Sequence, residues 1–370
     1  MARLDRICKL NMGQSPESSS YNENGNGIPF FQGNADFGVM HPTVRVWCNA
    51  PTKIAHKGDI LISVRAPIGA LNIADTECCI GRGLAALTVD DTLCEKSYLW
   101  YGLLAKVDEL NSKGTGSTFK AISKNVLAET EIYLPDISTQ KKISIELDNI
   151  SRLIFLRKQQ LSKLDELVKS RFIEMFGGVK DEEKVTLSDI CLIITDGTHQ
   201  PQKFTATGIP FLFVSNIVGN TITYDAEKFI SQETYAELIK RTPIEIGDVL
   251  LSTVGSYGHP AVVKSDKPFC FQRHIAYLKP KKELIDSEYL HGAILSVDVQ
   301  KQIEERVKGI AQKTLNLSEI RKIKIPLPTI DEQKQFASFV EQIDKSKFEI
   351  QKSLEKLETL KKALMQKYFG

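Results

Sequence analysis

The chain has 370 residues, a formal net charge of +2, and 42% hydrophobic against 25% charged residues. This composition is typical of a globular protein and excludes a disordered chain, and the length predicts two or three domains. No apolar run approaches the roughly 18 residues that a membrane span needs, and the first residues lack the apolar stretch of a signal peptide. We therefore expect a cytoplasmic protein that makes no membrane contact.

The cysteines argue against a disulfide framework and against a zinc site. Their number is odd, two are adjacent, and no pair has C-x-x-C spacing. We expect buried or idle thiols in a reducing cytoplasm. The seven residues are Cys8, Cys48, Cys78, Cys79, Cys94, Cys191 and Cys270.

The chain repeats itself once, and the matches keep their order over the whole length. Such a pattern indicates a tandem duplication in which each copy is a domain followed by a helix. The matched segments are 27–30 with 208–211, 58–63 with 247–252, 79–82 with 270–273, 134–135 with 327–328, 140–141 with 333–334, and 175–177 with 368–370.

Each domain, 1–136 and 179–329, is predicted to be mixed α/β. Short β-rich runs bounded by Gly and Pro predict strands at 59–64, 84–89, 248–254 and 274–278. One amphipathic helix is predicted at 97–111, with a counterpart at 287–307. The polar loops at 13–27 and 195–208 are either idle solvent loops or a reading surface.

The segments 137–178 and 330–370 predict two long helices. Apolar residues recur at alternating steps of four and three over about five heptads, which is typical of a coiled coil. Ser138 and Asp331 are predicted N-caps, and Gly177 and Gly370 predicted stops. Two separate amphipathic helices are the alternative, but the equal length and register favour mutual pairing.

The direction of that pairing follows from the chain order. The first helix leads almost directly into the second domain, and the second helix starts from that same domain, so the pair must be antiparallel. About 40 residues at about 1.5 Å each make a rod of about 60 Å. Lys347 and Lys361, at seam positions, are a local cost that fixes the register.

Catalytic signatures are missing from the sequence. It has no phosphate-binding G-x-x-x-x-G-K-[ST] loop, no G-x-S-x-G elbow, no His/Cys metal spacing and no Asp/Asn-Pro-Pro-Tyr tetrapeptide. The G-x-G-x-x-A pattern at 81–86 precedes a predicted strand instead of a helix, so it does not predict a dinucleotide site. The charges at 182–184 and at 332–334 are interpreted as solvated. We expect a non-catalytic protein.

Two similar domains held apart by a rigid rod could bind two sites at a fixed separation on a repeating polymer. Duplex DNA is such a polymer, with a repeat of 34–36 Å. Two non-identical domains would read two different half-sites around an unread spacer, with a span of at most ~17 base pairs for a rod of ~60 Å. The near-zero net charge does not oppose this, because a basic face can be balanced by an acidic one.

The chain resembles the specificity subunit of type I restriction–modification systems. The resemblance rests on Asn11-Met12-Gly13-Gln14-Ser15-Pro16, on residues 27–37 and 58–65, and on the doubled proline that leads into each helix, and it covers the whole length. It implies an α+β fold with two target-recognition domains, joined by central and distal conserved helices that form an antiparallel coiled coil.

The resemblance also implies partners and cofactors. The chain would bind double-stranded DNA, dock two methyltransferase subunits, and join motor-nuclease subunits in the full complex. S-adenosylmethionine, ATP and Mg²⁺ would belong to those partners and none to this chain. The chemistry would be adenine N6 methylation, or ATP-driven translocation and cleavage.

The predicted reading residues are polar side chains that can reach base edges or phosphates. Where the two copies differ, as at Arg65 and Val254, sequence reading is favoured; a hydrogen bond within a loop or a solvated charge is the alternative for each. In the first domain they are Gln14, Ser15, Gln32, Asn34, Arg65 and Arg82, with Lys120 on phosphate. In the second domain they are His199, Gln200, Gln202, Asn216, Ser256, Tyr257 and Arg273, with Lys313 on phosphate.

Other functions stay open at this stage. The chain could serve a different restriction arrangement, or act as a solitary copy with another system's methyltransferase. It could also be a protein–protein scaffold of duplicated domains on a coiled coil that binds no DNA. Enrichment of a specific duplex would separate DNA reading from the scaffold.

Overall fold

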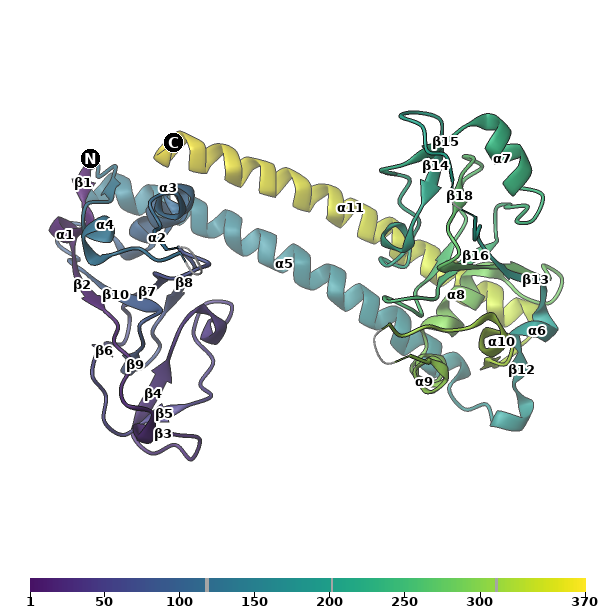
Figure 1. The fold of residues 1–370 in the computed structure, drawn as a ribbon, viewed down its shortest axis with the longest axis horizontal. Helices are drawn as coiled ribbons and strands as arrows, with labels where there is room; N and C mark the ends of the chain where they lie inside the picture. The colour runs from purple at the N-terminus through teal and green to yellow at the C-terminus, as the bar shows by residue number, and fades with distance from the viewer. Residues whose placement is uncertain (117–119, 201, 310–311) are drawn as a thin grey trace. The chain divides into compact units, whose positions relative to one another are not determined.

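The computed structural model describes residues 1–116, 120–200, 202–309 and 312–370, and the chain divides into two compact units. The first unit comprises Met1–Lys158 with Lys352–Gly370, and the second comprises Gln159–Gln351. Each contains a mixed α/β domain and parts of both long helices, α5 (Ile137–Phe176) and α11 (Ile330–Phe369), which Figure 1 shows as the longest helices. Within the described part of the chain, no helix has the length and apolarity to span a membrane.

The described part of the first unit contains two larger β-sheets and the two-stranded sheet β1-β11. The four-stranded antiparallel sheet has the order β2-β10-β7-β8, and the five-stranded sheet has the order β3-β5-β4-β9-β6. The predicted strands at 59–64 and 84–89 are confirmed as β7 and β10. The bounds of the strands are β1 Ala2–Arg3, β2 Cys8–Met12, β3 Tyr21–Asn22, β4 Ile28–Phe31, β5 Trp47–Cys48, β6 Ile54–Ala55, β7 Ile60–Ser63, β8 Leu71–Ile73, β9 Cys78–Ile80, β10 Leu84–Val89 and β11 Glu131–Ile132.

The second unit repeats this plan with fewer strands. Its four-stranded sheet has the order β13-β19-β16-β17, and its three-stranded sheet the order β15-β14-β18. The predicted strands at 248–254 and 274–278 are confirmed as β16 and β19. The bounds of the strands are β12 Val185–Thr186, β13 Cys191–Asp196, β14 Ile209–Leu212, β15 Phe229–Ile230, β16 Val249–Ser252, β17 Pro260–Val262, β18 Cys270–Phe271, β19 Ile275–Pro280 and β20 Lys324–Ile325.

The duplication is confirmed down to the strand register. In the first unit β4 pairs in parallel with β9, with Phe31 opposite Ile80, and in the second unit β14 pairs in parallel with β18, with Leu212 opposite Phe271. Apolar residues of each sheet face the helices of the same unit and form its main core. The repeated sequence motifs therefore occupy equivalent places in two copies of one fold.

Each predicted domain helix is in fact two short helices. Residues 97–111 form α2 (Lys96–Ala105) and α3 (Val107–Ser112), and residues 287–307 form α8 (Ser287–Leu295) and α9 (Val297–Arg306). The second break has a local cause, because Ser296 is extended (φ −61°, ψ 149°) and its hydroxyl accepts a hydrogen bond from the Val299 N–H. Ser296 thus caps a new helix. The remaining short helices are α1 Leu4–Ile7, α4 Lys124–Ala128, α6 Leu187–Ile190, α7 Gln232–Leu238 and α10 Leu317–Ile320.

The long helices are each capped two residues earlier than expected. Asp136, not Ser138, accepts hydrogen bonds from the Ser138 and Thr139 N–H groups at 3.1 and 3.0 Å. Hydrogen bonds from the Ser138 and Thr139 hydroxyls, and then these backbone bonds, lower the pKa of its carboxyl. At α11, Thr329 replaces Asp331 as the cap, and the Thr329 hydroxyl and the Glu332 carboxylate satisfy each other's backbone N–H in a capping box.

Antiparallel pairing of the helices is confirmed within each unit. In the first unit the start of α5 packs with the end of α11, where the Tyr368 hydroxyl donates to Glu146 Oε2 at 2.6 Å. In the second unit the end of α5 packs with the start of α11, where the rings of Phe172 and Phe336 meet edge-on at 5.4 Å. The seam residue Lys347 is paired with Asp165 at 2.5 Å, so its charge is compensated.

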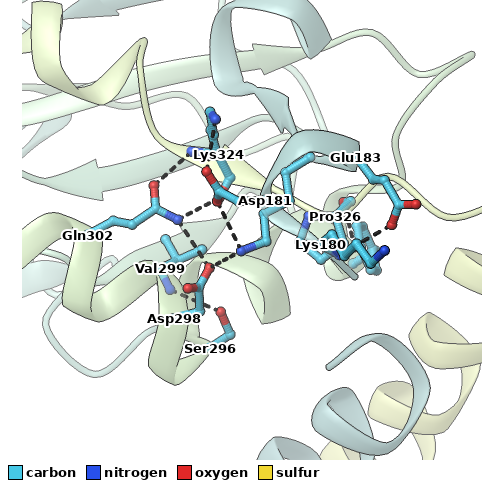
Figure 2. Close-up of polar contacts among 11 residues, drawn as sticks. Lys180, Asp181, Glu183, Ser296, Asp298, Val299, Gln302, Lys324 and Pro326 are labelled. Atoms are coloured by element: carbon cyan, nitrogen blue, oxygen red, sulfur yellow. Dashed lines mark hydrogen bonds and ion pairs between the residues drawn. The ribbon is translucent and has the colours of Figure 1, made fainter. Parts of the chain in front are cut away.

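The segment after α5 is tied to the second domain by a polar network, which Figure 2 shows. The Lys184 ammonium lies 3.1 Å from Asp298 Oδ2 and 3.4 Å from Asp181 Oδ1, and the Lys324 ammonium lies 3.0 Å from Asp181 Oδ2. The Lys184 side chain is only 12% exposed. The interpretation of 182–184 as solvated charge is therefore wrong for Lys184, which joins the linker to α9.

Candidate nucleic-acid interface

In the first unit, several loops that follow strands meet at one edge of the sheets. The parallel strands β4 and β9 end at the same edge, and backbone hydrogen bonds join the loops that follow β2, β7 and β9. The Gln14 N–H donates to the Ile80 carbonyl at 3.0 Å, and the Val64 N–H donates to the Gly83 carbonyl at 2.9 Å. We call the loops 13–16, 32–34, 64–67 and 81–83 the first edge.

Predicted reading residues gather on the first edge. The Ser15 hydroxyl contacts the Gln32 amide at 2.9–3.0 Å and accepts the Arg82 backbone N–H at 3.3 Å. The contact needs a glycine behind it, because a Cβ at Gly81 would lie 2.7 Å from Gln32 Oε1. Gln14 immediately precedes Ser15 on the same loop, and Asn34 begins the short 3₁₀ turn Asn34–Asp36 beside Gln32.

Two cationic residues flank this cluster. Arg65 forms an isolated β-bridge with Ala121, and the Ala66 N–H donates to the Lys120 carbonyl at 2.9 Å, so both side chains start from the same short ladder. Arg65, Arg82 and Lys120 are exposed. Among the described residues, none of the three side chains has a hydrogen bond or ion pair. Their donors are therefore available to an anionic or hydrogen-bonding ligand.

The second unit builds an equivalent edge with the same backbone bonds. The Thr198 N–H donates to the Phe271 carbonyl at 3.3 Å, and the Thr253 N–H donates to the His274 carbonyl at 2.9 Å. These bonds match those of Gln14 and Val64 in the first unit. We call the loops 197–200, 213–216, 253–258 and 272–274 the second edge.

A histidine and arginine cluster occupies the second edge. His199 Nε2 lies 2.7 Å from Asp196 Oδ2, and the Arg241 guanidinium lies 2.5 Å from the other oxygen of the same carboxylate. Arg273 Nε lies 3.4 Å from the imidazole of His274. Burial, followed by the charges of Arg273 and His199, lowers the pKa of His274 below its ordinary value.

Sequence reasoning missed two residues of this cluster. His274 is adjacent to the predicted Arg273 and takes the place of Gly83, so the repeat contains a signal for it. Arg241 follows α7, and its contact with Asp196 spans 45 residues, so no local pattern predicts it. A cavity of about 300 Å³ separates the Asp196–Gln200 segment from the end of α7.

Other predicted residues of the second domain are engaged within the protein. Asn216 is buried; its amide oxygen accepts the Phe213 N–H at 2.9 Å, and its amide nitrogen donates to the Thr223 and Asp225 carbonyls at 3.1 Å each. We therefore assign Asn216 to loop formation and not to reading. The Gln202 amide donates to the Thr198 hydroxyl at 3.1 Å and to the Gln200 carbonyl at 2.8 Å, while the Gln200 side chain is exposed.

The loop after β16 differs electrostatically from its counterpart after β7. The Lys313 ammonium lies 2.7 Å from Glu304 Oε1, and the Tyr257 hydroxyl donates to the other oxygen at 2.5 Å. Ser256 is exposed on the same loop. Lys313 starts from the place equivalent to Lys120, because the Gly255 N–H donates to the Lys313 carbonyl. The Glu304 carboxylate thus compensates the charge of Lys313, the predicted phosphate contact of the second domain. Lys120, the predicted phosphate contact of the first domain, has no such partner among the described residues.

Acidification is expected to destabilise the protein through His274. Because the folded-state pKa of His274 is lowered, the unfolded chain binds more protons below about pH 6.5. The free energy of unfolding should therefore fall as the pH is lowered from 7.5 to 5.5. Urea unfolding of His274→Gln, followed by far-UV circular dichroism, should show a shallower fall than the wild type. Equal pH profiles would show that His274 does not titrate differently on folding.

Comparison with known proteins identifies the family. The model of the type I restriction modification DNA specificity domain matches residues 1–166 and again 179–362. The chain therefore belongs to this family and carries two copies of its domain.

Individual relatives agree with this assignment. A type I restriction enzyme specificity subunit (MjaX) of Methanocaldococcus jannaschii is 39% identical over 165 residues, which span 45% of this chain and 39% of that protein. The EcoBI specificity subunit of Escherichia coli is 21% identical and covers 99% of this chain and 84% of its own length. The crystal structure of an S subunit from M. genitalium, 17% identical, has the same fold with a TM-score of 0.58 over 100% of this chain and 95% of that one.

Proposed function

We propose that the chain is the DNA-recognition subunit of a type I restriction–modification complex, and that the first and second edges each read half of a bipartite site. Family membership supports the class of function. One observation carries the asymmetry: the two edges share a backbone hydrogen-bond framework but present different side chains, with Arg65 against Val254, Gln32 against Phe213, and Gly83 against His274. Different side chains on one framework select different base pairs.

The long helices have two roles in this proposal. Each has 40 residues, or about 60 Å, which sets the length of the unread spacer. They also dock two methyltransferase subunits, because large apolar side chains remain exposed along them, and such side chains mark protein contacts when they gather. On α5 these are Ile145, Leu153, Phe155, Leu156, Leu167 and Ile173, and on α11 they are Phe348 and Leu360.

The proposal assigns no catalysis to this chain. S-adenosylmethionine would bind to the methyltransferase subunits, and ATP and Mg²⁺ to the motor-nuclease subunits, which supply adenine methylation and cleavage. Within the part of the chain that the structure describes, no group of three or more His, Cys, Asp or Glu side chains is placed to hold a metal ion.

The test is selection of DNA by the reconstituted complex. The full chain, assembled with the methyltransferase subunit of its own system, is incubated with random duplexes, and the retained molecules are sequenced. We expect an enriched motif with two defined segments and a spacer of constant length, and methylated adenines within it. A complex that assembles but enriches no sequence would favour the protein–protein scaffold instead.

A further inference from the structure

The second unit contains a cavity of about 360 Å³ that the proposed DNA reading does not use. Its walls come from the end of α5, from α8, from the start of α11 and from the loop 219–224. Phe172 and Phe336 provide aromatic walls, Gly292 provides a wall without a side chain, and Asp344 provides a carboxylate. The space is therefore large enough for an aromatic ring and has a polar group at one side.

The internal repeat shows which residue fills the equivalent space in the first unit. Tyr98 of α2 corresponds to Tyr289 of α8, because both are fully buried and donate a hydroxyl hydrogen bond of 2.7 Å to equivalent carbonyls, those of Tyr133 and Pro326. Three residues further along the same helices, Tyr101 corresponds to Gly292. The second unit thus has no tyrosine ring at this position, and the Phe336 ring, which lies 2.6 Å from the place of a Gly292 Cβ, fills only the part nearest the α8 backbone.

Tyr101 occupies a well-defined place in the first unit. It is 4% exposed, its hydroxyl donates to Asp148 Oδ1 at 2.8 Å and lies 3.1 Å from the Ser151 hydroxyl, and the Lys361 ammonium lies 5.7 Å from its ring centroid. The ring therefore lies between α5 and α11, with its hydroxyl on a carboxylate.

The register of the long helices shows that the cavity in the second unit is equivalent to the place of Tyr101 in the first unit. Gln140 and Gln333 make the same three backbone hydrogen bonds in their units, so they are equivalent. Counting along each helix from them, Ser151 corresponds to Asp344. Asp344 lines the cavity, as Ser151 lines the space of the Tyr101 hydroxyl.

The cavity also contains an unsatisfied polar atom. The Tyr224 hydroxyl, which belongs to its lining, is buried, and within the described ranges no group makes a well-aligned hydrogen bond with it, although the Ser265 side chain lies close by. Buried hydroxyls are normally paired. Lys264 lies 3.0 Å from both Glu288 and Asp344. Over the whole lining, three lysines (Lys169, Lys264 and Lys347) face three carboxylates (Asp165, Glu288 and Asp344), so the charges balance and a neutral ligand suits the cavity.

We propose that this cavity is a binding site for a phenol-class ligand, that is, an aromatic ring of tyrosine size with one hydroxyl. The ring would lie against Phe172 and Phe336, where Tyr101 lies in the first unit. Its hydroxyl would donate to the Asp344 carboxylate, as Tyr101 donates to Asp148, and would accept from Tyr224. The inference is independent of DNA recognition, because it rests on the comparison of the two copies.

The first test uses p-cresol, the free tyrosine side chain, on the full-length protein. Saturation-transfer NMR should show saturable binding of p-cresol, tighter than that of toluene, which lacks the hydroxyl. N-acetyl-tyrosinamide distinguishes the source: binding of this probe supports a side chain offered by a polypeptide, whereas binding of p-cresol alone supports a free small phenol. If neither p-cresol nor N-acetyl-tyrosinamide binds saturably, the proposal is overturned.

Variants locate the site. Gly292→Tyr combined with Phe336→Ile copies the first unit, which has Tyr101 and Ile143; the second change is needed because a Cβ at Gly292 would lie 2.6 Å from the Phe336 ring. This double variant should keep its circular dichroism and lose p-cresol binding. Binding that persists in the folded double variant overturns the proposal.

Tyr224→Phe keeps the test decisive if the double variant does not fold. It removes only the unpaired hydroxyl, so p-cresol binding should weaken several-fold while toluene binding stays unchanged. An unchanged ratio of the two affinities overturns the hydroxyl assignment. Conversely, Tyr101→Gly should open a second p-cresol site in the first unit.

Discussion

Replacing Gln333 with leucine is expected to lower the free energy of unfolding by about 3–5 kcal/mol, because buried backbone groups left unpaired cost about 1–3 kcal/mol each. Gln333 is fully buried; its amide oxygen accepts the Asp286 N–H at 2.8 Å, and its amide nitrogen donates to the Leu284 and Pro328 carbonyls at 3.0 and 2.9 Å. Leucine satisfies none of these groups. Urea unfolding measures the loss, and hydrogen exchange should assign it to the second unit.

Two further variants make this prediction specific. Gln335→Leu changes an exposed glutamine on the same helix and should alter stability by less than about 0.5 kcal/mol. Gln140→Leu removes the equivalent bonds of the first unit and should cost as much as Gln333→Leu, with the loss in the other unit. A Gln333→Leu protein as stable as the Gln335→Leu protein would contradict the role of the amide.

Replacing Arg65 with alanine is expected to remove discrimination at one base pair of the DNA site, at a cost of about 1–3 kcal/mol, since a guanidinium reads guanine through two hydrogen bonds. Lys120→Ala should instead weaken binding to all sequences alike and reduce the salt slope by about one. Both residues are exposed and start from one short ladder. Fluorescence anisotropy of the methyltransferase complex on single-base variants of the selected site measures both effects.

The matched control is Val254→Ala, which changes the residue equivalent to Arg65 in the second unit. It should leave discrimination at the Arg65 base pair unchanged. If Arg65→Ala weakened every sequence equally, Arg65 would contact phosphate, and base reading in the first unit would have to be assigned to Gln32 or Arg82.

The fold was largely predictable because the repeat doubles every signal. The parallel strands β4 and β9 and their counterparts β14 and β18 coincide with repeated motifs. What the pattern missed was local competition between side chain and backbone. Ser296 is an ordinary helix residue by periodicity, yet its hydroxyl caps the next helix. Asp136, two residues before Ser138, accepts the Ser138 and Thr139 N–H groups and so caps α5 in place of Ser138.

The candidate interface was less predictable, because contacts with residues distant in the sequence decide which of its side chains are free to bind a ligand. Residue type alone marks Asn216 as a reader, but three backbone groups in the folded loop occupy its amide. Lys120 and Lys313 are indistinguishable in the sequence, whereas Glu304 compensates only Lys313. The repeat identifies equivalent positions; the contacts that make them different arise on folding.

The composition of the first unit has a consequence for biosynthesis. Its core combines Leu4, Tyr98 and Leu147 with Leu364 and Phe369 from the end of α11, whereas the second unit draws on the uninterrupted stretch Gln159–Gln351. Domains usually fold in the order of translation, the amino-terminal one first. Here the first unit cannot complete its core until residues 352–370 have been synthesised. The unit whose synthesis begins first is therefore the unit whose folding is completed last.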